Sequence, residues 1–354
     1  MKRENSIDIL RIIAFLGIVA IHVSGPFLST YENNIDTLSE VYKFIVCLFN
    51  CIGRFGVPVF LMISGEFLLK NEKNADYKVF YKKSIKKLFI PTFIFSIIFF
   101  IYKIVIAIFN NNSIMGIIKY FVIGKSFYHM WYMYMLIGVY VFIPVLIKIK
   151  KEIGEEKFKL ITYIYFPISI ICLWTTKSTI QWNPGISVLY LSYVMLGYVI
   201  SNNKKNKSKI KFWLFLIISL SFEILMSIIL KFLINSGNNT KLQIQENTSP
   251  LSALAGIFMF LAFNYLRVEK DWIKISNLTF YGYIIHALIL DIILKINIMI
   301  LGKEYYLNVN PTVAIPSITI ITFLLSLLFA YILKKIIKRF SKNENHPTNS
   351  VTKL

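Results

Sequence analysis

Apolar runs of about 20 residues recur along the whole chain, and they constrain its fold more than any other feature. A run of this length can cross the hydrocarbon core of a bilayer as a helix. A transmembrane barrel would need short segments of alternating hydrophobicity, and the sequence has none. The chain is therefore predicted to be an all-α integral membrane protein.

Ten spans are predicted, and the charges between them set their orientation. Lys and Arg are concentrated before the first span and in every second connection after it, where they are roughly four times as numerous as in the other connections. Such residues accumulate on the cytoplasmic side, so both termini are predicted to be cytoplasmic. One basic connection, 71–87, is predicted to be a loop. The predicted spans are about 7–27, 44–69, 88–109, 130–149, 159–176, 186–201, 211–234, 251–267, 277–300 and 314–338.

A single membrane domain is predicted for residues 1–340, followed by a polar, disordered tail at 341–354. In a soluble protein the net charge of +21 would suggest nucleic acid, but here membrane topology accounts for it and no nucleic-acid partner is expected. The three cysteines lie in apolar runs, so neither a disulfide framework nor a metal site is predicted. The sequence indicates no oligomeric state and no partner protein.

The first span carries Arg11 and His22 within its apolar run. Ionisable residues inside a span are costly, which makes both functional candidates. They are 11 residues apart, close to three helical turns, so they share a helix face and lie roughly 16 Å apart along the axis. The alternative is that Arg11 reaches a lipid headgroup and His22 is a satisfied interfacial histidine.

Further cations lie in and after the second span. Arg54 is predicted near mid-depth, where it cannot easily reach water, so it should face the protein interior. The glycine and proline that follow it weaken the helix, as at a cavity-lining or closely packed position. Lys83, Lys86 and Lys87, here called the lysine patch, precede the third span. They suit phosphate oxygens of a lipid or of a nucleotide-bearing cosubstrate, or form an ordinary cytoplasmic flank.

Two groups of histidine and aromatic residues complete the candidates. His129, Trp131 and Tyr132 begin the fourth span at its outer end, where they fit an aromatic belt or an outer carbohydrate site. Tyr283 and His286 lie about one turn apart in the ninth span, where they fit a structural hydrogen bond or a functional site.

These patterns, in this order, resemble the membrane acyltransferase-3 family of bacterial O-acyltransferases of surface polysaccharides. The chain departs from the family pattern at Lys83-x-x-Lys86, where two arginines are common, and at Glu66, where an aromatic residue is usual. Lysine presents a compact ammonium charge, whereas the guanidinium of arginine can donate two parallel hydrogen bonds to one phosphate. The resemblance runs from about residue 6 to 338 and rests on Arg11 with His22, on Phe55-Gly-Val-Pro58 with Ser64-Gly65, on His129-x-Trp131-Tyr132 and on Tyr283-x-x-His286.

The resemblance implies an O-acyltransferase of the bacterial cell membrane with no bound cofactor. It would transfer an acyl group, above all acetyl, from cytoplasmic acyl-CoA to a hydroxyl of a cell-envelope glycan or lipid-linked sugar. The lysine patch would bind the phosphates of acyl-CoA, and His22, Arg11 and Arg54 are the catalytic candidates. His22 would act as general base or carry the acyl group as an acyl-imidazole, with a cation such as Arg54 stabilising the oxyanion.

Two other functions fit the same residues. A transporter or flippase for an anionic envelope precursor would use the intramembrane Arg and His residues as ligands for its cargo. A membrane sensor or partner subunit would carry no chemistry. The lysine patch and the absence of a visible internal repeat favour the enzyme.

Overall fold

The computed structural model describes residues 4–175, 184–202, 206–237, 244, 248–302 and 304–343, and its regular structure within these ranges is helical, with no strand. Nine helical segments there are long and apolar enough to cross a membrane, and a shorter apolar helix, Pro250–Tyr265, occupies the position of the predicted span 251–267. The predicted all-α integral membrane fold is confirmed. Of the predicted tail, residues 344–354 lie outside the described residues.

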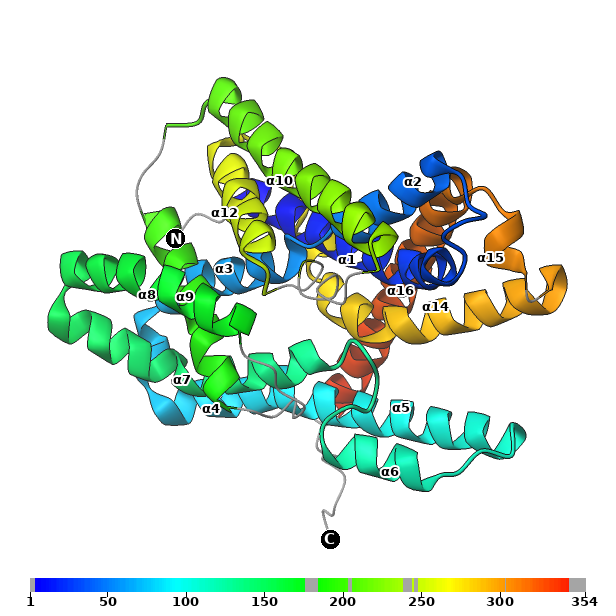
Figure 1. The fold of residues 1–354 in the computed structure, drawn as a ribbon. Coiled ribbons are helices and arrows are strands. Elements are labelled where there is room, and N and C mark those ends of the chain that lie inside the picture. Colours follow the sequence, from blue (N-terminus) through cyan, green and yellow to red (C-terminus); the bar gives the residue numbers. More distant parts are fainter. Residues whose placement is uncertain are drawn as a thin grey trace, which may run out of the picture.

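The helices follow one another with short connections (Figure 1). The first half of the chain forms α1 (Asn5–Asn33), α2 (Glu40–Cys51), α3 (Gly56–Leu69), the 3-10 turn η1 (Glu72–Ala75), α4 (Tyr77–Ser84), the π-helical turn η2 (Ile85–Phe89), α5 (Ile90–Phe109), α6 (Met115–Val122), α7 (Trp131–Ile153) and α8 (Glu155–Thr175). The second half forms α9 (Pro184–Asn202), α10 (Lys209–Asn235), α12 (Pro250–Tyr265), α13 (Ile273–Ser276), α14 (Thr279–Leu301), α15 (Tyr305–Asn308) and α16 (Pro311–Asn343).

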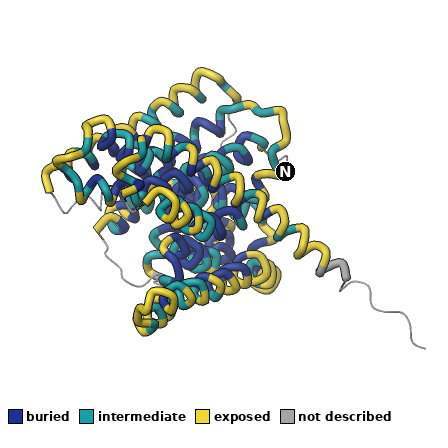
Figure 2. The backbone as a smooth tube through the Cα atoms, turned by 90° about the vertical axis from the view of Figure 1, so that its right-hand side faces the viewer, coloured by how far each residue is buried: buried dark blue, intermediate teal, exposed yellow. Residues whose placement is uncertain are grey.

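Helix α1 lies at the centre of this arrangement and contacts α2, α3, α12, α14 and α16. Its interior side chains are fully buried, Phe15 and Val19 among them. The outer helices expose apolar side chains instead, and Figure 2 shows the buried residues gathered inside a shell of exposed ones. Exposed apolar surface on long helices is the pattern of a protein that faces lipid.

The second predicted span is broken in the middle. Helix α2 ends at Cys51 and α3 begins at Gly56, so residues 52–55 form a non-helical joint. Pro58 falls in the first turn of α3, where its missing N–H would have had no intrahelical partner. The joint is held by two other helices, because Ser252 of α12 donates to the Arg54 carbonyl oxygen at 2.9 Å and Glu223 of α10 accepts from the Phe55 N–H at 3.3 Å.

Helix α12 is short because it starts at this joint. Its 16 residues cover about 24 Å, less than the roughly 30 Å of a hydrocarbon core. Its first turn holds Ser252, the residue that contacts the joint.

The segment 71–87 is not the loop that was predicted. The turn η1, helix α4 and the π-helical turn η2 occupy almost all of it and lead directly into α5. Asp76 caps α4 by accepting from the Val79 N–H at 3.1 Å, and Phe80 is buried in the core. The Asp76 cap and the burial of Phe80 stabilise helix α4, although the many lysines of this segment favoured a loop.

Candidate functional site

Helix α1 carries Arg11 and His22 into two different cavities. The outer cavity, of about 550 Å³, is lined by His22, and the inner cavity, of about 650 Å³, is lined by Arg11. The two cavities have no lining residue in common among the residues that the structure describes. Arg11 and His22 were predicted to share one helix face, but the structure places them in two separate cavities.

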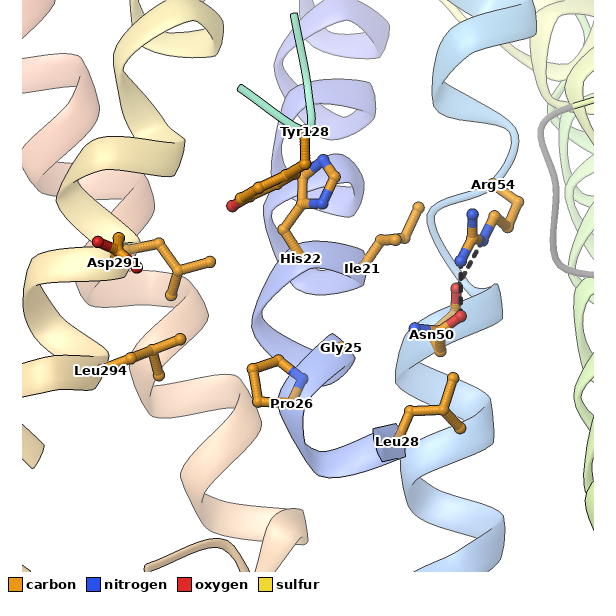
Figure 3. Close-up of a pocket in the computed structure, with 11 residues that line it drawn as sticks. Ile21, His22, Gly25, Pro26, Leu28, Asn50, Arg54, Tyr128, Asp291 and Leu294 are labelled. Carbon is orange, nitrogen blue, oxygen red and sulfur yellow. Dashed lines mark hydrogen bonds between the residues drawn. The ribbon is translucent and has the colours of Figure 1, made fainter. Parts of the chain in front are cut away.

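The outer cavity combines one histidine with one arginine. Its polar lining consists of His22, Asn50, Arg54, Tyr128 and Asp291, and the rest is apolar (Figure 3). The His22 and Tyr128 rings lie 4.9 Å apart between centroids. An imidazole and a guanidinium that border the same cavity can act on one bound group.

The Arg54 side chain is oriented by Asn50. Its Nε donates to the Asn50 carbonyl oxygen at 2.9 Å and its Nη2 to Asn50 Oδ1 at 2.6 Å (Figure 3). Asn50 in turn donates to Ser24 Oγ at 3.2 Å, and Ser24 lies two residues after His22. This chain of hydrogen bonds links the guanidinium to the helix that carries the histidine.

Two glycines allow the joint that carries Arg54 to approach the helix that carries His22. A Cβ on Gly53, in the joint, would lie 2.1 Å from the backbone oxygen of Gly17 on α1. Only glycine permits this approach, because any larger residue would place its Cβ against backbone. The contact fixes the joint, and with it Arg54, against α1 at Gly17, five residues before His22.

Glu223 is a site residue that the sequence analysis missed. It is fully buried on α10, its Oε1 accepts from the Phe55 N–H, and its Oε2 has no hydrogen-bond partner among the described residues. It lies close enough to Arg54 for an electrostatic interaction between the two side chains. A lone carboxylate within the long apolar helix α10 was the signal that could have identified it.

Three histidines from distant parts of the chain meet beside the outer cavity. The His286 ring lies 5.2 Å from the His22 ring and 5.0 Å from the His129 ring, between centroids. His286 Nδ1 donates to the Tyr283 carbonyl oxygen and His129 Nε2 to the Ile284 carbonyl oxygen, the latter at 2.8 Å. A carbonyl oxygen only accepts, so these two bonded nitrogens carry hydrogen, whereas His286 Nε2 and His129 Nδ1 are buried without a hydrogen-bond partner among the described residues.

A layer of rings separates the two cavities. Tyr132 and Tyr283, 5.2 Å apart between ring centroids, line the inner cavity, and the Tyr283 hydroxyl donates to the His129 carbonyl oxygen at 2.9 Å. Tyr283 also lies 5.3 Å from His286, which leads on to His22. We call Tyr132, Tyr283, His129 and His286 the ring layer.

The ring layer changes the placement expected for its members. His129 and Tyr132 are buried inside the protein and are not exposed at the outer interface, because they pack against Tyr283 and His286 of α14. Trp131 stays on the outer side, where it borders a small pocket with Tyr128.

The inner cavity is strongly cationic. Arg11 and the lysine patch line it together with Lys334 of α16, and no Asp or Glu is among its described lining residues. The π-helical turn η2 carries Lys86 and Lys87. Lys334, which the sequence analysis did not single out, reaches this cavity because α16 packs on α14. Several ammonium groups around one cavity suit a ligand with several phosphates.

Arg54 does not belong to this cationic set. It lines the outer cavity with His22, so the structure separates it from the lysine patch. Among the described residues no group of three or more His, Cys, Asp or Glu is arranged to hold a metal ion.

A family model described as an acyltransferase domain matches residues 4–331 of the chain. No curated protein and no solved structure matches it.

Proposed function

Because the chain belongs to the membrane acyltransferase-3 family and is a membrane acyltransferase, we propose that it transfers an acyl group, above all acetyl, from cytoplasmic acyl-CoA to a hydroxyl of a cell-envelope glycan. The observation that carries the proposal is the arrangement of the two cavities. Five cations surround the inner cavity, and a histidine with an oriented arginine borders the outer cavity, on the other side of the ring layer. We further propose that the protein acts in the bacterial cytoplasmic membrane.

The donor binds in the inner cavity under this proposal. The phosphates of acyl-CoA meet the lysine patch, Lys334 and Arg11, which supply charge-assisted hydrogen bonds. The acyl-bearing arm then points towards Tyr132 and Tyr283. For the thioester to reach His22, the arm has to pass the ring layer, since the inner and outer cavities share no lining residue among those described.

The acyl transfer takes place beside His22. A neutral imidazole removes the proton of the acceptor hydroxyl as its oxygen attacks the thioester carbonyl. Arg54 stabilises the negative charge on the carbonyl oxygen, a contribution of about 3 kcal/mol in comparable sites. The C–S bond then breaks, and the leaving thiolate takes the proton from the imidazolium, so that CoA leaves as the thiol.

A two-step route uses the same residues. His22 can attack the thioester itself and carry the acyl group as an acyl-imidazole, which the acceptor hydroxyl then cleaves. A single-turnover experiment without acceptor separates the routes, because only the two-step route leaves label on the protein.

Proteoliposomes of known orientation test the proposed function. Acyl-CoA labelled in the acyl group is supplied only on the side of the lysine patch, and envelope glycan only on the other side. Label on the glycan supports the proposal. Absence of donor consumption with acetyl-, succinyl- and longer acyl-CoA, with glycan present, would contradict it.

A further inference from the structure

A third cavity lies between α5 and α14 on the outer side, next to the outer cavity. This lateral cavity, of about 450 Å³, is lined by Tyr102 and Lys103 of α5 and by Asp291 and Lys295 of α14. Tyr128 and Asp291 line both the lateral cavity and the outer cavity that holds His22. Only these two side chains are common to both linings, so they form the boundary between a ligand in the lateral cavity and the cavity of the histidine.

The lateral cavity carries an excess of positive charge. Lys103 lines it and also borders the small adjoining pocket that holds Lys125. Asp291 is already engaged, because it accepts from the Tyr102 hydroxyl and, at 2.9 Å, from Lys295 Nζ. No carboxylate of the described residues lies within ion-pairing distance of Lys103 or Lys125.

These lysines are unusual for their position. They belong to the outer half of the protein by the charge asymmetry of the chain, where Lys and Arg are few. Lys103 is half-buried at the outer part of a span, with its ammonium 5.4 Å from the Phe127 ring centroid. A partly desolvated cation without a carboxylate partner is costly, and an anionic ligand would remove that cost.

The helices that flank the lateral cavity face the bilayer. Val105 and Ile108 of α5 and Ile296 and Met299 of α14 are exposed apolar residues beside it. Figure 1 shows α5 and α14 running as separate arms towards their far ends, with α6 alongside α5. A ligand that enters this cavity between α5 and α14 therefore enters from the hydrocarbon region of the membrane.

We propose that the lateral cavity admits the acyl acceptor from the bilayer, and that this acceptor is an amphiphile whose phosphate binds Lys103 and Lys125 while its sugar hydroxyl reaches Tyr128 and His22. This inference rests on the proposed function and narrows its substrate class. The chemistry requires a phosphate on a lipid anchor, and a free phosphate or a soluble sugar phosphate would satisfy only the lysines.

A capture experiment tests the phosphate contact without relying on catalysis. The full chain in nanodiscs is illuminated with a photoreactive polyprenyl phosphate, and the label is located by mass spectrometry. Label on α5 and α14 is expected, and the Lys103→Gln, Lys125→Gln double variant should lose about tenfold in capture, because each lysine offers a charge-assisted contact. Lys119→Gln is the matched control, since Lys119 is exposed on α6 and lines none of the described cavities.

The same experiment separates the possible sources of the anion. A Lys103→Arg, Lys125→Arg double variant, which keeps both charges, should capture the lipid as well as the native chain does. Equal capture of an uncharged polyprenol glycoside would overturn the phosphate contact. Competition by millimolar inorganic phosphate as effective as competition by the unlabelled lipid would overturn the lipid anchor.

A blocking variant tests the path from the bilayer. Ile106 lines the lateral cavity, whereas Val105 beside it is exposed. Ile106→Trp should lower transfer to a polyprenyl-phosphate-linked sugar at least tenfold and leave acyl-CoA binding unchanged, and Val105→Trp should change neither. Unchanged transfer in Ile106→Trp would overturn the path. If the native chain consumes no acyl-CoA, the proposed function fails, while the capture experiment still decides whether the phosphate site exists.

Discussion

The contact between Gly17 and Gly53 makes the strongest quantitative prediction. A Cβ added at Gly53 would lie 2.1 Å from the Gly17 backbone oxygen, and this separation has to lengthen by about 1.3 Å to reach 3.4 Å, the shortest ordinary contact. Backbone cannot rotate away as a side chain can, so the joint has to move from α1 and take Arg54 with it. A misplacement of about 1 Å in a catalytic arrangement costs on the order of 100-fold in rate.

Gly53→Ala is therefore expected to lower acyl transfer by roughly 100-fold, equivalent to about 2.7 kcal/mol in activation free energy. Gly17→Ala should have a smaller effect, because its Cβ would meet the Gly53 Cα at 2.9 Å. Gly116→Ala is the control, since nothing lies within 4 Å of its Cβ.

The assay is label transfer from acyl-CoA by purified protein in nanodiscs, with the elution profile and acyl-CoA binding recorded for each variant. The expected order of rates is Gly116→Ala, then Gly17→Ala, then Gly53→Ala. A folded Gly53→Ala protein that transfers label at the native rate would refute the reasoning that this contact positions Arg54.

Two further predictions concern the charged groups on the inner side. Lys87→Gln and Lys334→Gln should each weaken acyl-CoA binding roughly three- to tenfold with little change in kcat, and high salt should remove this effect. Lys82→Gln should leave binding unchanged, because Lys82 is exposed beside the patch and lines neither cavity. Equal effects of all three changes would contradict the binding role of the inner cavity. Lys150→Met should destabilise the protein by about 1–3 kcal/mol, because the buried Lys150 ammonium donates to the Leu69 carbonyl oxygen at 3.0 Å and to the Tyr198 hydroxyl at 2.9 Å. Lys151→Met is the control, because Lys151 is the exposed residue next to Lys150. Lys151 donates to Glu72 and holds the pKa of that carboxyl below its ordinary value. This ion pair is therefore formed at neutral pH and is lost as the pH falls through the lowered pKa. Thermal unfolding in detergent should show a clear loss for Lys150→Met and little for Lys151→Met, and equal losses would contradict the distinction.

The fold was largely predictable from the sequence, because apolar runs of membrane length indicate the spanning helices directly. The predicted loop at 71–87 was wrong, since the helix there depends on the Asp76 cap and on burial of Phe80. Burial of a single side chain is a tertiary effect that periodicity does not reveal.

The site was predictable only in part. Arg11, His22 and the lysine patch are ionisable residues in or beside apolar runs, and the sequence alone identifies such residues. Their division between two cavities comes from tertiary packing. The position of Arg54 in the cavity of His22 involves the close contact between Gly17 and Gly53.

Other parts of the site come together from distant segments. His129 and His286 are 157 residues apart along the chain and meet only through packing of the segment before α7 on α14. Lys334 and Glu223 likewise reach the site from helices whose neighbours the sequence does not specify. The catalytic and binding roles of all these residues stay predictions.

The most direct test of the central claim is acyl transfer by His22→Ala, measured together with acyl-CoA binding. Protein in nanodiscs receives acetyl-CoA labelled in the acetyl group and an envelope glycan, and Ser29→Ala, an exposed change on the same helix, serves as control. The account predicts that His22→Ala still binds acetyl-CoA with native affinity but transfers label about 10²- to 10⁴-fold more slowly, the usual range for loss of a general base. Transfer at the native rate by His22→Ala would contradict it.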